Sequence, residues 1–136
     1  MIKKAGCILV NIAKQEVALV CRKGKYSFPK GHLELNEEIQ ECAIRETIEE
    51  TGHNCHLVNS KEISIIYYND SKGNKIENYF YLAIDDGVSK KRISEEDKEK
   101  MIWKKWSEVE VSLSHQNLKN FWNEIKYKVE RVIKNG

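Results

Sequence analysis

The chain has 136 residues, of which 40% are hydrophobic and 32% are charged, with a net charge of +2. This length predicts one domain over residues 1–136, and the composition excludes a disordered chain. The balanced charge gives no reason to expect nucleic acid or membrane as a partner, and no apolar run is long enough to predict a membrane span.

The cysteines and the N-terminus bear on the compartment. The four cysteines form no CxxC pair and no Cys–His spacing typical of zinc sites. We interpret them as free thiols of a reducing compartment. The start has two lysines and a short apolar stretch without a small-residue cleavage site, so we expect a strand rather than a signal peptide. The sequence therefore predicts a cytoplasmic protein.

The first half predicts two strands, a loop and a helix. Short apolar runs predict strands over 5–10 and 16–22. Residues 24–33 contain the only proline and two glycines, which is typical of a structured loop. A helix is expected over 37–51, with Asn36 as its N-cap and Gly52 at its end.

The second half predicts three more strands and a long helix. Strands are expected over 62–68, 76–84 and 100–106, with a polar loop over 85–98. Apolar residues at three- and four-residue spacing then predict an amphipathic helix capped by Ser114; they are Leu118, Phe121, Trp122, Ile125, Val129, Val132 and Ile133. This order favours a mixed sheet covered by helices on both faces.

The predicted first helix is strongly acidic. Residues 34–50 contain seven glutamates and one arginine, a local charge of −6, so the rest of the chain has +8. Glu46, Glu49 and Glu50 stand at i, i+3 and i+4 and share one helix face. Oxygen-only ligands favour Mg²⁺ or Mn²⁺, which leave coordination positions for phosphate oxygens and water.

Residues around this face have candidate supporting roles. Arg45 follows Glu37 by about two helical turns, so the two are candidates for an ion pair that orients the metal ligands. Arg45 also stands four residues from both Glu41 and Glu49. The alternative interpretation is therefore an ordinary surface ion pair between Arg45 and these glutamates. Gly31 permits close approach of the backbone to the helix, and Lys30 has a charge suited to phosphate.

These residues form a motif. Residues 31–53, GHLELNEEIQECAIRETIEETGH, resemble the Nudix box, a glycine, five residues, Glu, seven residues, then Arg-Glu-apolar-any-Glu-Glu-any-Gly-apolar. Its acidic, arginine and glycine positions are all present, whereas Thr47 and His53 replace apolar residues, a difference that we expect to affect packing. The match comprises Gly31, Glu37, Arg45, Glu46, Glu49, Glu50 and Gly52.

The resemblance to this MutT-like hydrolase family implies a fold and an activity. The fold is an α/β/α sandwich around a mixed sheet, and the reaction is Mg²⁺-dependent hydrolysis of a nucleoside diphosphate linked to another moiety. The implied metal ligands are Glu46, Glu49, Glu50 and the carbonyl next to Gly31, with Glu37 and Arg45 as the supporting pair. The general base is a box glutamate or one outside the box, for which our candidates are Glu99, then Glu95 and Glu96.

The substrate class is a finer hypothesis. The segment Phe28–His32 resembles the entry to the box in enzymes that act on dinucleoside polyphosphates and on diphosphoinositol polyphosphates. The pair Lys75 and Tyr79 resembles a segment of the dinucleoside tetraphosphate hydrolases, in which the lysine and tyrosine contact the phosphate chain. Lys30, Lys75, Tyr79 and Tyr26 are therefore candidate substrate-binding residues, and Tyr26, Tyr68 and Tyr79 are candidates for stacking on a base.

Alternatives stay open within and beyond the enzyme class. The runners-up are a pyrophosphatase of ADP-ribose or nucleotide sugars and one of modified nucleoside triphosphates. A non-catalytic nucleotide-sensing module is the alternative of another class. A small-molecule nucleotide is the expected partner, and the protein is expected to be a monomer or homodimer.

Overall fold

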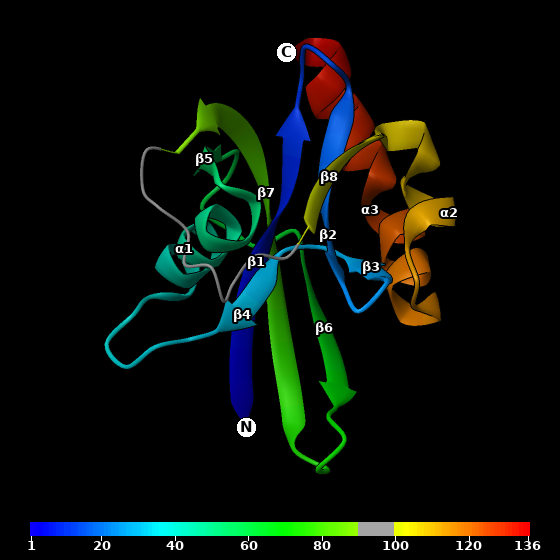
Figure 1. Cartoon of the computed structure of the whole chain (residues 1–136). Coiled ribbons are helices and arrows are strands. Elements are labelled where there is room, and N and C mark those ends of the chain that lie inside the picture. Colours follow the sequence, from blue (N-terminus) through cyan, green and yellow to red (C-terminus); the bar gives the residue numbers. More distant parts are fainter. Residues whose placement is uncertain (90–99) are drawn as a thin grey trace.

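The centre of the molecule is an eight-stranded mixed sheet (Figure 1). The computed structural model describes residues 1–89 and 100–136. Strand β1 (Ile2–Asn11) pairs in parallel with β7 (Lys75–Val88) and antiparallel with β2 (Glu16–Arg22). The remaining strands are β3 (Lys25–Ser27), β4 (Lys30–His32), β5 (His53–Leu57), β6 (Ser64–Asn69) and β8 (Lys100–Lys105). β1 is buried from residue 5 to residue 10 because neighbours flank it and helices cover it.

Helices cover both faces of the sheet, as Figure 1 shows. Helix α1 (Ile39–Thr51) packs on one face through Cys42 and Ala43. Helix α3 (Gln116–Asn135) packs on the other, after a 3-10 turn η2 (Trp106–Glu108) and the short α2 (Val109–Ser112). The expected α/β/α sandwich around a mixed sheet is therefore confirmed.

The alternation of β7 divides its residues between the two layers. Side chains of a strand point alternately to opposite faces. Phe80 and Leu82 pack in the core under α3, whereas Tyr79, Tyr81 and Ala83 pack with the cluster under α1. Asn78 shares the face of Phe80, and Tyr79 does not.

The C-terminal helix has the predicted apolar stripe, but a different first residue. Its stripe is buried apart from Val132, which is partly exposed. The N-cap is His115 rather than Ser114, because the Ser114 hydroxyl instead accepts the backbone N–H of Tyr26 at 2.8 Å. The stripe meets Phe28 and Phe80, whose rings lie 5.9 Å apart.

The start of α1 also differs from the prediction. The N-cap is Glu38, and its backbone N–H donates to Glu41 Oε1 at 3.0 Å. Asn36 has a φ of 64° and forms part of the preceding turn instead of the cap. The predicted end at Gly52 is confirmed by its left-handed φ of 75° and its N–H, which donates to the Ile48 carbonyl at 2.8 Å.

Short strands account for most other differences. The segment 24–33 contains β3 and β4, which are held by β2 and β1 rather than by any periodicity of their own. Strand β5 was not predicted, and β7 continues through the polar residues 85–88 because β5 pairs with them. In the described part of the chain, no helix is long and apolar enough to cross a membrane.

Thr47, one of the two departures from the motif, is fully buried in α1. Its hydroxyl has no conventional hydrogen-bond partner within residues 1–89 and 100–136, and the thiol beside it, Cys7, is a weak hydrogen-bonding group. We predict that Thr47→Val increases the free energy of unfolding by about 1 kcal/mol, because a buried unsatisfied hydroxyl is removed without a cavity. Urea denaturation measures this, with Thr47→Ala as the control that opens a cavity. A less stable Thr47→Val protein would contradict the prediction.

Candidate active site

Two glycines bring β4 between β1 and α1. A Cβ atom added to Gly31 would lie 2.0 Å from Glu46 Oε2, and one added to Gly6 would lie 1.8 Å from the Pro29 carbonyl oxygen. A side chain at Gly6 would therefore collide with the backbone of Pro29 and Lys30, whereas a side chain at Gly31 would displace the Glu46 carboxylate. The close approach of Gly31 to the helix is as expected, and it places the β4 backbone beside the carboxylates of α1.

An ion pair connects the loop before α1 to the helix itself. Arg45 Nε donates to Glu37 Oε2 at 2.6 Å, and Arg45 Nη2 donates to Glu37 Oε1 at 2.9 Å. Nη2 also donates to the His32 carbonyl at 3.0 Å. The paired guanidinium lowers the pKa of the Glu37 carboxyl to about 2. The structure thus brings together the predicted supporting pair.

The other side of the same guanidinium faces the acidic helix. Arg45 Nη1 lies 2.8 Å from Glu46 Oε1 and 3.2 Å from Glu49 Oε2. Glu41 does not contact Arg45; it accepts the Glu38 backbone N–H instead. One arginine therefore reduces the repulsion among several carboxylates of α1 while it fixes the loop.

Glu46, Glu49 and Glu50 line one cavity of about 310 Å³. Cationic side chains line it too, so the cavity holds both charge signs at close range. The remaining lining residues are Lys4, Arg22, Lys30, Gly31, His32 and Glu34. Metal ions and phosphate groups are the ligands that such a mixed lining suits.

Burial disfavours the ionised form of two carboxylates of this cavity, those of Glu50 and Glu46. Desolvation raises the pKa of Glu50 to about 7, although Glu50 Oε1 accepts the Lys30 backbone N–H at 3.0 Å. Burial also raises the pKa of Glu46 and lowers that of the Lys30 amine. A bound cation would favour the charged forms of both carboxylates.

The residues present fit a divalent cation. The donors are carboxylate oxygens and the nearby Gly31 carbonyl, which is the donor set of Mg²⁺ and Mn²⁺. The β4 backbone at Gly31 runs beside the Glu46 carboxylate, and the Gly31 carbonyl accepts a weak hydrogen bond from Cys42 Sγ at 3.6 Å. Over residues 1–89 and 100–136, however, no three His, Cys, Asp or Glu residues are already gathered as a metal cluster. Arg45 pairs with Glu46 and Glu49 in this arrangement, so binding a cation requires these carboxylates to turn from the arginine.

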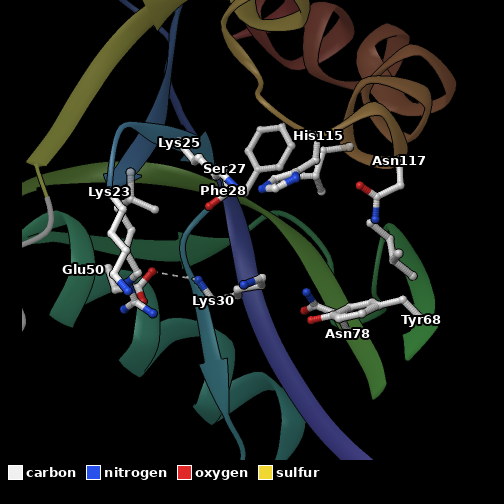
Figure 2. Close-up of a pocket in the computed structure, with 14 residues that line it drawn as sticks. Lys23, Lys25, Ser27, Phe28, Lys30, Glu50, Tyr68, Asn78, His115 and Asn117 are labelled. Carbon is white, nitrogen blue, oxygen red and sulfur yellow. Dashed lines mark hydrogen bonds between the residues drawn. The ribbon is translucent and has the colours of Figure 1, made fainter. Parts of the chain in front are cut away.

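A second cavity of about 470 Å³ continues from the first, with Arg22, Lys30 and Glu50 common to both. Figure 2 shows Glu50 and Lys30 at one end and Tyr68 with Asn78 at the other. The rest of its lining combines apolar side chains with polar and charged ones. The apolar residues are Val20, Phe28, Ile66 and Leu118, and the polar or charged ones are Lys23, Lys25, Ser27, His115 and Asn117. A long channel-like site of this kind accommodates a charged group beside a flat apolar one.

The remaining predicted residues lie elsewhere. Tyr26 packs against the core under α3, and its side chain lines neither cavity. Lys75 stands at the start of β7 opposite Asn69, and Tyr79 faces the α1 layer, where its hydroxyl donates to Glu77 at 3.3 Å. Neither residue lines the two cavities. Glu95, Glu96 and Glu99 lie outside the described residues.

Sequence reasoning missed several lining residues. Lys4 and Arg22 stand near strand ends without a motif of their own, and His32 lies within the motif at a position with no assigned role. Asn78 did have a signal: it interrupts the apolar face that Ile76, Phe80 and Leu82 form on one strand.

The raised pKa of Glu50 predicts a pH-dependent stability. An acid whose pKa is higher in the folded state than its ordinary value of 4.5 imposes no penalty below pH 4.5 and its full penalty above about pH 7. We predict that, in EDTA, the free energy of unfolding of Glu50→Gln increases relative to that of the wild-type protein as the pH rises from 4.5 to about 7. The full difference above this range is about 3 kcal/mol. Denaturation curves at several pH values measure the difference, and Mg²⁺ should reduce it. Equal differences at pH 4.5 and pH 8 would contradict the prediction.

Comparison with known proteins identifies a family for this chain. The family model described as NUDIX domain matches residues 2–129. A Caenorhabditis elegans relative named for the Nudix family is 46% identical over 44 residues, which are 32% of this chain and 12% of that protein. This chain therefore spans a small part of that relative.

Solved structures share the fold over nearly the whole chain. A Caenorhabditis elegans Ap4A hydrolase in a binary complex has a TM-score of 0.74 at 19% identity, covering 97% of this chain and 98% of that one. A MutT protein from Bacillus halodurans has a TM-score of 0.71 at 25% identity, covering 93% and 82%. Nudix hydrolases act on small-molecule nucleotides and generally require a divalent metal. The match over residues 2–129 shows that this chain belongs to the Nudix hydrolase family, enzymes that act on phosphoric anhydrides.

Proposed function

We propose that the protein is a Mg²⁺-dependent pyrophosphohydrolase of dinucleoside polyphosphates such as diadenosine tetraphosphate. The observation that supports this most directly is the mixed cavity, in which Glu46, Glu49 and Glu50 lie with Lys4, Arg22 and Lys30. Carboxylates and cations in one place suit a metal–phosphate complex better than either ligand alone.

The metal site consists of three glutamates and a carbonyl. In this proposal Glu46, Glu49, Glu50 and Gly31 hold Mg²⁺, with Mn²⁺ as the second choice. When bound, the ion supplies charge neutralisation at the phosphate and a more acidic water. Arg45 and Glu37 do not touch the substrate; their ion pair orients the helix face and the β4 carbonyls.

Lys30 and the general base complete the proposed site. The Lys30 amine lines both cavities, which suits it to hold the phosphate chain where they join. Proton removal from the attacking water is assigned to a box glutamate or to Glu99, with Glu95 and Glu96 as further candidates. The reaction then replaces one P–O bond of the anhydride by a bond to the water oxygen.

The choice of a dinucleoside polyphosphate has its own support. The segment Phe28–His32 matches that substrate class in sequence, and it contributes Phe28 to the larger cavity and Lys30 to both. Basic residues extend beyond the acidic helix, which suits a long polyanion. Contact by Lys75 and Tyr79 requires a substrate that reaches beyond the cavities, as a second nucleoside would. The C. elegans Ap4A hydrolase has the same fold, at 19% identity.

The compartment is part of the same proposal. All four cysteines are free in the structure, which supports a reducing compartment such as the cytoplasm.

We predict that Glu49→Gln decreases kcat for diadenosine tetraphosphate by at least about 100-fold with little change in Tm, since a ligand charge is lost from a partly exposed position. Steady-state kinetics in Mg²⁺ and thermal melting in EDTA measure both effects. Glu124→Gln, an exposed position on α3, is the matched control and should leave both unchanged. A fully active Glu49→Gln enzyme would refute the metal assignment.

A substrate panel tests the proposed class. The panel contains diadenosine tetraphosphate, ADP-ribose, a nucleotide sugar, the common nucleoside triphosphates and an oxidised guanine nucleotide, with products separated by chromatography. We expect the highest kcat/KM for the tetraphosphate, with ATP and AMP as products. Preference for another compound would replace the substrate class and retain the metal chemistry. Tight binding without cleavage of any compound would indicate a sensing module.

A further inference from the structure

The larger cavity contains a buried polar group that the proposed hydrolysis does not use. Asn78 is only 1% exposed, and its Oδ1 atom has no hydrogen-bond partner within residues 1–89 and 100–136. The residue lines the cavity at the end away from Glu50, as Figure 2 shows. Buried amide oxygens nearly always have a partner, so a donor that a ligand supplied at this end of the cavity would satisfy this one.

The sequence could have avoided this unpaired group. The neighbours of Asn78 on the same face of β7 are Ile76 and Phe80, both buried and apolar. An apolar residue at this position would continue the core and impose no desolvation penalty. A polar residue at a core-facing strand position lowers stability, and when it lines a cavity such a residue is typical of a binding site.

The surroundings of Asn78 suit a flat ring. Tyr68 lies beside it in Figure 2, and Phe28, Ile66 and Leu118 form apolar lining of the same cavity. A tyrosine face provides a stacking surface for any base, whereas the amide provides the directional contact. Together they suit an aromatic heterocycle with an N–H group on its edge.

The opposite end of the cavity suits phosphate. Lys30 and Glu50 line this cavity and the metal-side cavity alike. A nucleotide with its phosphates near Lys30 would thus direct its base toward Tyr68 and Asn78. A carboxamide can accept from the exocyclic amino group of adenine and donate to the adjacent ring nitrogen, a pairing that purine without the amino group cannot form fully.

We infer that Asn78 is a specificity-determining residue that accepts a hydrogen bond from the amino group of a 6-aminopurine, with the base stacked near Tyr68. The inference rests on the proposed function for the placement of the phosphates, and it adds which nucleoside the site selects.

The test is calorimetric binding of AMP and of purine riboside 5′-monophosphate to the full chain in EDTA. The two ligands differ only in the amino group. We expect the wild-type protein to bind AMP about 10-fold more tightly, the ratio that one hydrogen bond to a buried group provides. Equal affinities, or no AMP binding at millimolar concentration, would overturn the inference without any variant.

A variant separates this role from a structural one. Asn78→Leu should decrease the affinity for AMP to that for the purine analogue, while its Tm without ligand stays equal or rises. Asn120→Leu is the matched control, an exposed asparagine of α3 that lines neither cavity, and it should retain the 10-fold preference. Retained preference in Asn78→Leu, or a lowered Tm in that variant, would contradict the assignment.

This experiment is independent of hydrolysis. AMP has no P–O–P linkage, and EDTA removes divalent metal. If the protein cleaves no anhydride and yet prefers AMP through Asn78, only the proposed function fails. If it cleaves diadenosine tetraphosphate and binds both monophosphates equally, only the Asn78 inference fails.

Discussion

The ion pair between Arg45 and Glu37 is the interaction on which the site depends. Two nearly parallel hydrogen bonds at 2.6 and 2.9 Å fix the loop against α1, and a third at 3.0 Å holds the His32 carbonyl. Without this cation, the carboxylates of the helix would repel one another, and the backbone of β4 would lose one of its contacts with α1. Bidentate geometry explains why a lysine would not serve here.

Burial gives the site its reactivity toward cations. Glu50 is desolvated enough to raise its pKa to about 7, so the protein without metal keeps a carboxyl that is costly to ionise. A divalent cation would reverse that balance, and metal binding would then be coupled to the stability of the fold. The second cavity adds apolar side chains beside this charged centre, so in the proposed function one continuous site would offer separate surroundings to phosphate and to base.

The sequence predicted the parts of this molecule that have local signals. The box spacing identified the acidic face, and the stripe of α3 predicted its buried side. Other features depend on tertiary contacts: β3 and β4 exist because β2 and β1 pair with them, and Ser114 binds the Tyr26 backbone rather than capping α3. Tyr79 shows what a motif leaves open. Its motif predicts contact with a phosphate chain, which stays a prediction; strand alternation directs Tyr79 to the α1 layer, whereas the neighbouring Asn78 lines the larger cavity.

The central claim is that the acidic face of α1 is a divalent-metal site. Anomalous diffraction from crystals of the protein soaked in Mn²⁺ would test this most directly. The account predicts one or more anomalous peaks within coordination distance of Glu46, Glu49 and Glu50, with the Arg45–Glu37 pair retained. Anomalous peaks only elsewhere in the protein would contradict this claim. So would Glu46 and Glu49 side chains that are still paired with Arg45 at saturating Mn²⁺.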